Sequence, residues 1–279
     1  MKQRIITAIV GISIGLVIVF LSDTIIFPIA VAFISAYSVY ELLNVCRMRK
    51  YPVHFAGCLV FTAAMPFLAY FRVDYGIRYV IVFITVFVMF AGYVGDHKKL
   101  PFEKLCVMIA VTALISLSVT CIISLKNIDD VHGIIYVVMA LMAAWLPDGG
   151  AYFVGTALGK HKLCPDISPK KTVEGAIGGA VVSVIVFVIF AVCYQSIMAA
   201  RGVMFTVNYL LLIIAVLVCA VIAIVGDLSA SLIKRENELK DFGNLMPGHG
   251  GIVDRFDSVY FILPFLLIIF SVFDVFPAA

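Results

Sequence analysis

Apolar stretches of roughly the length that crosses a membrane repeat along the whole chain. A transmembrane helix needs about 20 predominantly apolar residues. Stretches that meet this pattern cover residues 5–21, 24–43, 53–71, 79–95, 105–125, 133–155, 176–196, 209–225 and 259–275. Since lipid cannot hydrogen-bond to exposed backbone groups, each stretch is expected to be a helix. The pattern therefore predicts an all-α integral membrane protein, with residues 1–279 forming a single polytopic domain of about nine transmembrane helices.

The placement of basic residues predicts how these helices are oriented. Lysine and arginine are retained preferentially on the cytoplasmic side of short loops. A cytoplasmic N terminus leaves only four of the 20 lysines and arginines outside, namely Arg72, Arg78, Lys126 and Arg201. The first apolar stretch has no small-x-small cleavage site, so we expect it to be retained. This topology puts the two longest polar segments, residues 156–175 and 226–258, on one cytoplasmic face, where they could form one site.

Composition agrees with a membrane location and narrows the choice of partners. The chain is 63% hydrophobic and 13% charged, with a mean hydropathy of +1.14, whereas soluble domains are about 25% charged. The net charge of +3 is too small to indicate a nucleic-acid partner. We therefore expect membrane lipids as surroundings and no nucleic acid.

Asp148 is the first candidate site residue, because it interrupts an apolar run. Pro147, Gly149 and Gly150 flank it and are expected to loosen the helix. A carboxylate at membrane depth costs about 2.5–3.5 kcal/mol on insertion scales, so it normally faces a polar cavity or a partner. The alternative is a proline kink in which Asp148 pairs with a lysine for packing.

The next polar segment contains the neighbouring lysines Lys170 and Lys171, followed by Thr172 and Glu174. Lysines can neutralise phosphate oxygens, and Thr172 could cap the helix that begins near Glu174. By charge alone, a loop attracted to anionic lipid headgroups is an equally good interpretation. Three nearby glycines, Gly175, Gly178 and Gly179, share a helix face and favour close helix packing.

Asp227 lies at the end of the eighth apolar stretch. If the helix continues, Asp227, Ser231 and Lys234 share one face. An acid beside a hydroxyl and an ammonium group suits a divalent cation with bound phosphate. The alternative is a solvated helix end that carries a charge pair.

Residues 242–251 are too rich in glycine for a continuous helix and should form a loop. Glycine lets backbone N–H groups approach a phosphate, and His249 could donate a hydrogen bond to it, although a histidine among glycines is also common in structural turns. Asp254, Arg255 and Asp257 follow and add two acids and a base. Together these segments favour phosphoryl or nucleotidyl transfer to a lipid, with the catalytic residues concentrated in residues 145–260.

The polar residues after the eighth stretch closely resemble the signature of the phosphatidate cytidylyltransferase family, whose members are also called CDP-diacylglycerol synthases. The resemblance rests on Ser231, Lys234, Arg235, Lys240, Asp241, Gly243, Pro247, His249, Gly250, Gly251, Asp254, Arg255 and Asp257, and on the stretches 148–155 and 168–175. Met246 and Val173 depart from the family pattern, but both remain apolar.

This resemblance implies that CTP and phosphatidic acid react to give CDP-diacylglycerol and pyrophosphate. It assigns Asp227 and Asp254 as the leading ligands of Mg²⁺, and it allows a second cation. Asp241 and Asp257 are second candidates for the metal or orient the basic residues. The catalytic residues that the resemblance implies are Lys240, Asp241, His249, Arg255 and Asp257, of which Lys240, His249 and Arg255 contact phosphate. Substrate binding is assigned to Asp148, Lys170, Lys171, Ser231 and Lys234.

The compact chain without a transit peptide indicates a multi-pass protein of the bacterial inner membrane, and the placement of lysine and arginine puts its active site on the cytoplasmic face. A homodimer is an option. Another membrane lipid phosphotransferase is the first alternative, but Asp148 and Gly149 match only a fragment of the pattern of enzymes that transfer CDP-linked lipid phosphates. A transporter is the second alternative. The clustering of charges in two polar segments, with few charges inside the apolar stretches, counts against it.

Overall fold

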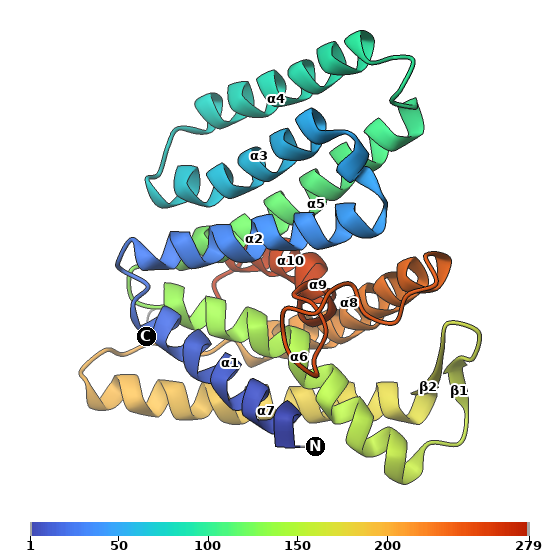
Figure 1. Ribbon diagram of the computed structural model, residues 1–279. Coiled ribbons are helices and arrows are strands. Elements are labelled where there is room, and N and C mark those ends of the chain that lie inside the picture. Colours follow the sequence, from blue (N-terminus) through green and yellow to red (C-terminus); the bar gives the residue numbers. More distant parts are fainter. Residues whose placement is uncertain (1, 278–279) are drawn as a thin grey trace. The chain divides into compact units, whose positions relative to one another are not determined.

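A computed structural model describes residues 2–277 and is almost entirely helical (Figure 1). The long helices are α1 (Lys2–Phe20), α2 (Ile26–Val45), α3 (Pro52–Tyr70), α4 (Tyr75–Gly95), α5 (Phe102–Lys126), α6 (Gly133–Leu158), α7 (Val173–Ala200), α8 (Tyr209–Glu236) and α10 (Val259–Val272). Three smaller kinds of element complete the fold: the 3₁₀ turn η1 (Met48–Lys50), the strands β1 (Lys162–Cys164) and β2 (Ser168–Thr172), and the short helix α9 (Val253–Phe256).

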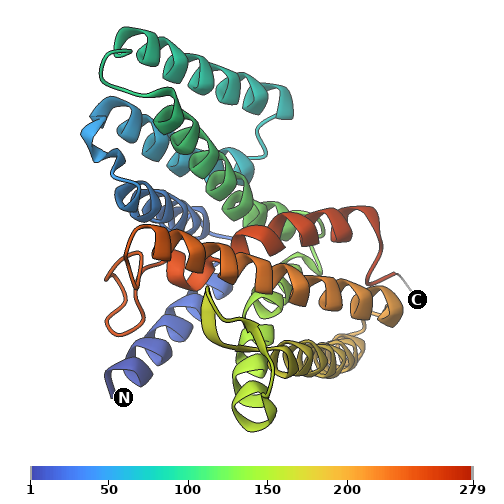
Figure 2. The ribbon, with the colours of Figure 1, turned by 90° about the vertical axis from the view of Figure 1, so that its right-hand side faces the viewer.

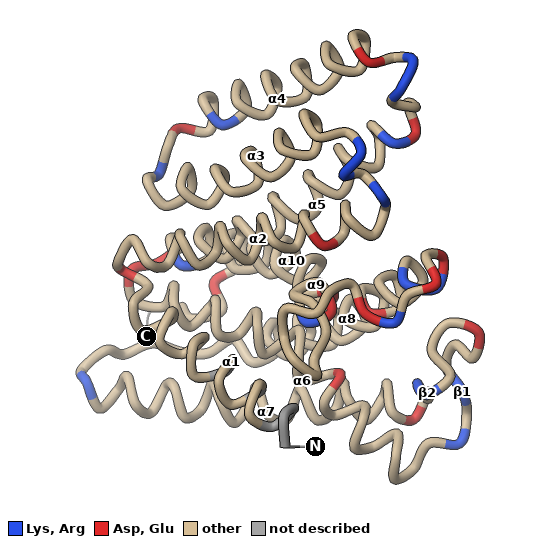
Figure 3. Tube along the Cα trace, viewed as in Figure 1, with Lys and Arg blue, Asp and Glu red and all other residues tan. Residues whose placement is uncertain are grey.

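Each of the nine predicted apolar stretches falls on one of these long helices. Within the described residues, seven helices, α2 to α8, are long and apolar enough to cross a membrane. The apolar part of α1, Ile9–Phe20, and helix α10 are shorter than the others. The all-α membrane class is confirmed, whereas the count of nine spans and the cytoplasmic N terminus stay predictions. Charged residues lie mostly at helix ends and in connections, as Figure 3 shows.

The chain divides into two compact units. Unit 1 contains residues 2–124 and 237–255, which include α1 to α4, nearly all of α5 and the glycine-rich loop. Helix α2 packs against α3, and α3 packs against α4. Ser116 of α5 donates a hydrogen bond to Thr62 of α3 at 2.8 Å, and both side chains are buried. Such hydrogen bonds join helices where the surroundings are as apolar as the side chains.

Unit 2 contains residues 125–236 and 256–277, and its centre is the tight pair α6 and α7. Glycines make this packing close. A Cβ on Gly179 would meet the Pro147 carbonyl oxygen and the Ala151 nitrogen, and a Cβ on Gly178 would meet the Val154 side chain. Helix α8 packs on both α6 and α7, and α10 packs on α6 and α8. The prediction that these glycines permit close helix packing is confirmed.

Helix α6 corrects one expectation from the sequence. Pro147, Gly149 and Gly150 were expected to loosen the helix, yet α6 is continuous from Gly133 to Leu158. Proline removes one backbone hydrogen bond, but neighbouring helices compensate for this in membrane proteins. Here the backbone around Pro147 lies directly against Gly179 of α7, so helix packing holds the segment in helical form.

A β-hairpin connects α6 to α7 and projects beyond these two helices (Figures 1 and 2). Its strands are antiparallel and pair Lys162 with Thr172 and Cys164 with Ser168. Thr172 then caps α7, because its side-chain oxygen accepts a hydrogen bond from the Gly175 N–H at 3.1 Å. The predicted cap is therefore confirmed, and it fixes where the second strand ends and the helix begins.

An aromatic cluster fills the opposite end of α6 and α7. His132 lies 2.7 Å from the Tyr194 hydroxyl, measured from Nδ1, and contacts the rings of Phe205 and Phe276. The His132 side chain is buried, and this burial lowers its pKa. The cluster thus ties α7 to the segments before α8 and after α10 through a neutral, hydrogen-bonded histidine.

Candidate active site

Asp148, Lys171 and Asp227 form a charged cluster in unit 2, and Lys171, at the end of the hairpin, lies at its centre. Its ammonium group lies 2.6 Å from an Asp227 oxygen and 3.5 Å from an Asp148 oxygen. Three elements therefore converge, since Asp148 comes from α6, Lys171 from β2 and Asp227 from α8. Burial opposes the charge on Lys171, but the two carboxylates outweigh it and raise the pKa of this lysine. The ammonium group is held in its charged form.

Lys170 differs from its neighbour. Successive residues of a strand point to opposite sides, and the structure leaves Lys170 exposed while Lys171 is partly buried. Within the described part of the chain, Lys170 forms no ion pair, whereas Lys171 forms two. Of these two neighbouring lysines, both predicted to bind substrate, the structure brings only Lys171 to Asp148 and Asp227.

Asp257 joins this cluster from the segment before α10. A Cβ on Gly226 would meet the Asp257 carbonyl oxygen and Ser258, so the absence of a side chain at Gly226 lets this segment approach α8. Ser258 secures the approach by donating a hydrogen bond to the Ala223 carbonyl at 3.0 Å. Burial and then the charge of Asp227 raise the pKa of Asp257 to about 7. The cluster has more acids than bases and therefore favours cations.

Helix α8 runs through Asp227 to Glu236 without a break. The condition for Asp227, Ser231 and Lys234 to share one helix face is therefore met. Lys234 is close enough to Asp257 to lower the pKa of that acid, which partly offsets the burial. Ser231 is partly buried, and its role in substrate binding stays a prediction.

The second group of predicted site residues is in unit 1 and surrounds the glycine-rich loop. The segment is a loop as predicted: Met246 N–H binds the Gly250 carbonyl and His249 N–H binds the Met246 carbonyl. Gly248 and Gly250 have φ values of +79° and +84°, a backbone conformation that glycine adopts without strain. The loop is closed by a tight turn.

Asp254 holds both ends of this loop together. One of its carboxylate oxygens accepts hydrogen bonds from the Phe242 N–H at 2.8 Å and the Gly251 N–H at 3.0 Å. Its side chain is buried. The predicted metal ligand therefore also organises the loop.

The other predicted residues in and beside this loop differ in exposure. Arg255 is exposed and donates from Nε to the His249 carbonyl at 3.0 Å. His249 Nδ1 is buried and has no hydrogen-bond partner among the described residues. Lys240 and Asp241 are exposed. Their catalytic roles stay predictions.

Sequence reasoning missed two acids that organise these segments. Glu174 at the start of α7 accepts hydrogen bonds from the Lys160 and His161 N–H groups at 3.0 and 3.1 Å, and so closes the base of the hairpin. Glu41 is buried on α2 and accepts a hydrogen bond from the Val253 N–H at 2.9 Å. The signal for Glu41 was present in the sequence, because an acid inside an apolar span is a candidate functional residue.

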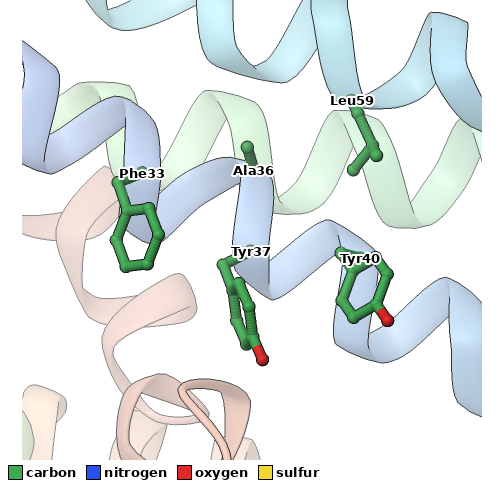
Figure 4. Close-up of a pocket in the computed structure, with 5 residues that line it drawn as sticks. All are labelled: Phe33, Ala36, Tyr37, Tyr40 and Leu59. Carbon is green, nitrogen blue, oxygen red and sulfur yellow. The ribbon is translucent and has the colours of Figure 1, made fainter. Parts of the chain in front are cut away.

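A shallow groove of about 300 Å³ lies on α2 and α3, and its lining is uncharged, unlike the two groups of site residues. Figure 4 shows its lining of Phe33, Ala36, Tyr37, Tyr40 and Leu59. No acid or base lines it. The groove therefore offers apolar contact and not charge stabilisation.

Comparison with known proteins covers both groups of residues. Residues 2–273 match the model of the cytidylyltransferase family. A phosphatidate cytidylyltransferase of Bacillus subtilis is 32% identical, over 98% of this chain and 99% of the relative. The phosphatidate cytidylyltransferase of Staphylococcus haemolyticus is 31% identical, over 96% and 98%. That of Staphylococcus saprophyticus is 42% identical over half of each chain. The chain belongs to the cytidylyltransferase family.

Proposed function

We propose that this protein transfers the cytidylyl group of CTP to phosphatidic acid and releases CDP-diacylglycerol and pyrophosphate. Similarity to phosphatidate cytidylyltransferases over nearly the full chain supports this substrate pair. The structural observation that carries the proposal is the convergence of Asp148, Lys171 and Asp227 from three separate elements. Such a cluster of acids and a fixed ammonium group suits chemistry on phosphates.

The reaction needs no nucleophilic side chain. An oxygen of the phosphatidate phosphate forms a bond to the α-phosphorus of CTP, and the bond from that phosphorus to the bridging oxygen of pyrophosphate breaks. The protein must bring two polyanions together and stabilise charge on the phosphorus oxygens and on the leaving group. Lys171 and Lys234 are the cations that we assign to this task in unit 2. In unit 1 we assign it to Lys240, His249 and Arg255.

The carboxylates fit a magnesium ion by their chemistry. No group of three or more acidic, cysteine or histidine side chains is arranged to hold a metal among the described residues. Mg²⁺ does not require such a cage, because it usually binds one or two carboxylates together with water and substrate phosphates. Asp227 is partly exposed, and Asp254 is buried where the glycine-rich loop closes. We propose Asp227 in unit 2 and Asp254 in unit 1, each within its own unit, as ligands of Mg²⁺. The ion would supply positive charge to the phosphates when bound.

We further propose that the protein resides in the bacterial plasma membrane with its site facing the cytoplasm, where CTP is made available. Helices α2 to α8 support the membrane location, and the relatives are bacterial. The placement of lysine and arginine in the sequence supports the orientation. A homodimer and a second cation stay predictions.

The decisive test uses purified protein in detergent micelles with phosphatidic acid, labelled CTP and Mg²⁺. We expect CDP-diacylglycerol and pyrophosphate in equal amounts, and loss of both on removal of Mg²⁺ with a chelator. Asp227→Asn and Asp254→Asn should each lower turnover by at least about 100-fold, since each removes charge that acts in the transition state. The matched control is Asp166→Asn, which alters an exposed acid of the hairpin. Absence of product from folded wild-type protein contradicts the proposal, and near-normal activity of either variant contradicts its metal role.

A further inference from the structure

Glu41 is the one charged residue of α2, and it is almost completely buried. Only 2% of the residue is exposed, although the remainder of α2 is apolar or uncharged. Burial of an acid in a membrane-spanning helix is costly unless the acid has partners. Glu41 is therefore expected to have polar partners in the fold.

The first partner is the backbone immediately before Asp254. Val253 donates its N–H to Glu41 Oε2 at 2.9 Å. On the neighbouring residue, Asp254 accepts the N–H groups of Phe242 and Gly251. Glu41 thus binds the chain at the point where Asp254 closes the glycine-rich loop.

Two glycines of the same loop face the Glu41 carboxylate. A Cβ on Gly243 would overlap Oε1, and a Cβ on Gly251 would overlap both oxygens. Neither glycine has a positive φ, in contrast to Gly248 and Gly250. The backbone conformation therefore does not require glycine at positions 243 and 251. Glycine is required there because the Glu41 carboxylate approaches too closely for a Cβ.

We propose that Glu41 is a positioning residue that clamps both ends of the glycine-rich loop and thereby fixes Asp254. The clamp consists of the Val253 hydrogen bond and of the contact with Gly243 and Gly251. The consequence for catalysis rests on the proposed function, in which Asp254 is a metal ligand. The clamp itself is a property of the folded protein without substrate.

The clamp is tested first by hydrogen exchange of the full-length protein in detergent, with neither substrate nor metal. Glu41→Ala should raise amide exchange in residues 242–253 by about tenfold, the effect of losing one hydrogen bond of about 1.4 kcal/mol. Glu41→Gln keeps an oxygen that can accept from Val253 and should exchange like the wild type. The shorter Glu41→Asp should behave like alanine. Glu103→Ala is the matched control, an exposed acid in the same unit.

If Glu41→Ala does not fold, the comparison between Glu41→Gln and Glu41→Asp decides the question. Faster exchange in the aspartate variant alone supports the clamp. Equal exchange of wild-type, glutamine and aspartate proteins overturns it. Failure of this experiment is distinct from failure of the proposed function, which would show as wild-type protein that makes no CDP-diacylglycerol.

Kinetics then test whether the clamp serves the reaction. Glu41→Asp and Glu41→Ala should lower kcat by about 10- to 100-fold, since small displacements of a reacting group have effects of this size. KM for CTP and for phosphatidic acid should change less than about threefold, because the loss lies in the transition state. Glu41→Gln should retain kcat within about threefold, because the hydrogen-bond acceptor remains. A glutamine variant as slow as the alanine variant would show that the charge matters and not the acceptor, and would overturn the proposal.

A double-variant cycle tests the contact with glycine. Gly251→Ala should slow the enzyme by about tenfold or more, because its new Cβ displaces the Glu41 carboxylate. When Glu41 is already alanine, the same change should cost much less, since the space has been vacated. Additive effects of Gly251→Ala and Glu41→Ala would contradict the contact.

Discussion

The pairing between Lys171 and Asp227 can be measured as a coupling free energy. The perturbation is a double-mutant cycle of Lys171→Met, Asp227→Asn and the double variant. Breaking a buried ion pair costs about 3–5 kcal/mol, whereas an exposed pair contributes about 0–1 kcal/mol. The side chains of Lys171 and Asp227 are 22% and 25% exposed, so this pair lies between the two limits. Asp148 remains near Lys171 as a second partner, which lowers the expected coupling to about 1.5 kcal/mol.

The assay is reversible unfolding of each variant in the same detergent, with the free energy of unfolding compared at one denaturant concentration. We expect the double variant to be less destabilised than the sum of the two single variants, by the coupling energy. The control cycle replaces Lys171→Met by Lys170→Met, which alters the exposed neighbour on the same strand, and should be additive. If the Lys171 cycle is also additive within about 0.3 kcal/mol, the ion pair does not stabilise the fold. That result would refute the expectation that partial burial strengthens this pair.

Two further predictions concern the packing of unit 2. Gly179→Ala should lower the free energy of unfolding by about 1–3 kcal/mol, because the new Cβ meets the α6 backbone; Gly149→Ala, where the structure leaves open space, is the control, and equal effects of the two would contradict the close contact. Tyr194→Phe should cost about 1–2 kcal/mol, since it leaves buried His132 without its hydroxyl partner. Tyr152→Phe, on an exposed tyrosine, is its control. A Tyr194→Phe protein as stable as this control would show that the hydroxyl does not support the histidine.

Local patterns predicted much of the fold. The apolar stretches located every long helix, because lipid leaves the backbone few alternatives to helix. Thr172 was identified as a cap, and α8 was expected to carry Asp227, Ser231 and Lys234 if it continued, since both features depend on residues only a few positions apart. These predictions needed no knowledge of tertiary contacts.

The remaining features depend on contacts between distant residues. Continuity of α6 through Pro147 depends on Gly179, which lies 32 positions later in the sequence. The choice between Lys170 and Lys171 required a strand that the sequence did not indicate. Glu41 acts on Val253, more than 200 residues away. No local pattern shows which distant residues are in contact. An acid inside an apolar span does, however, mark Glu41 as a candidate functional residue.

The glycine contacts between α6 and α7 have a consequence for the energetics of substrate capture. Helices whose backbones touch cannot slide or rotate without steric overlap, and the hairpin with Lys171 joins the ends of these two helices. Asp148 and Lys171 are therefore mounted on a stiff frame, and little conformational entropy is left to lose when a polyphosphate arrives. If the nucleotide binds at Asp148 and Lys171, as proposed, its binding energy is then available for the reaction, because it is not consumed in ordering the protein.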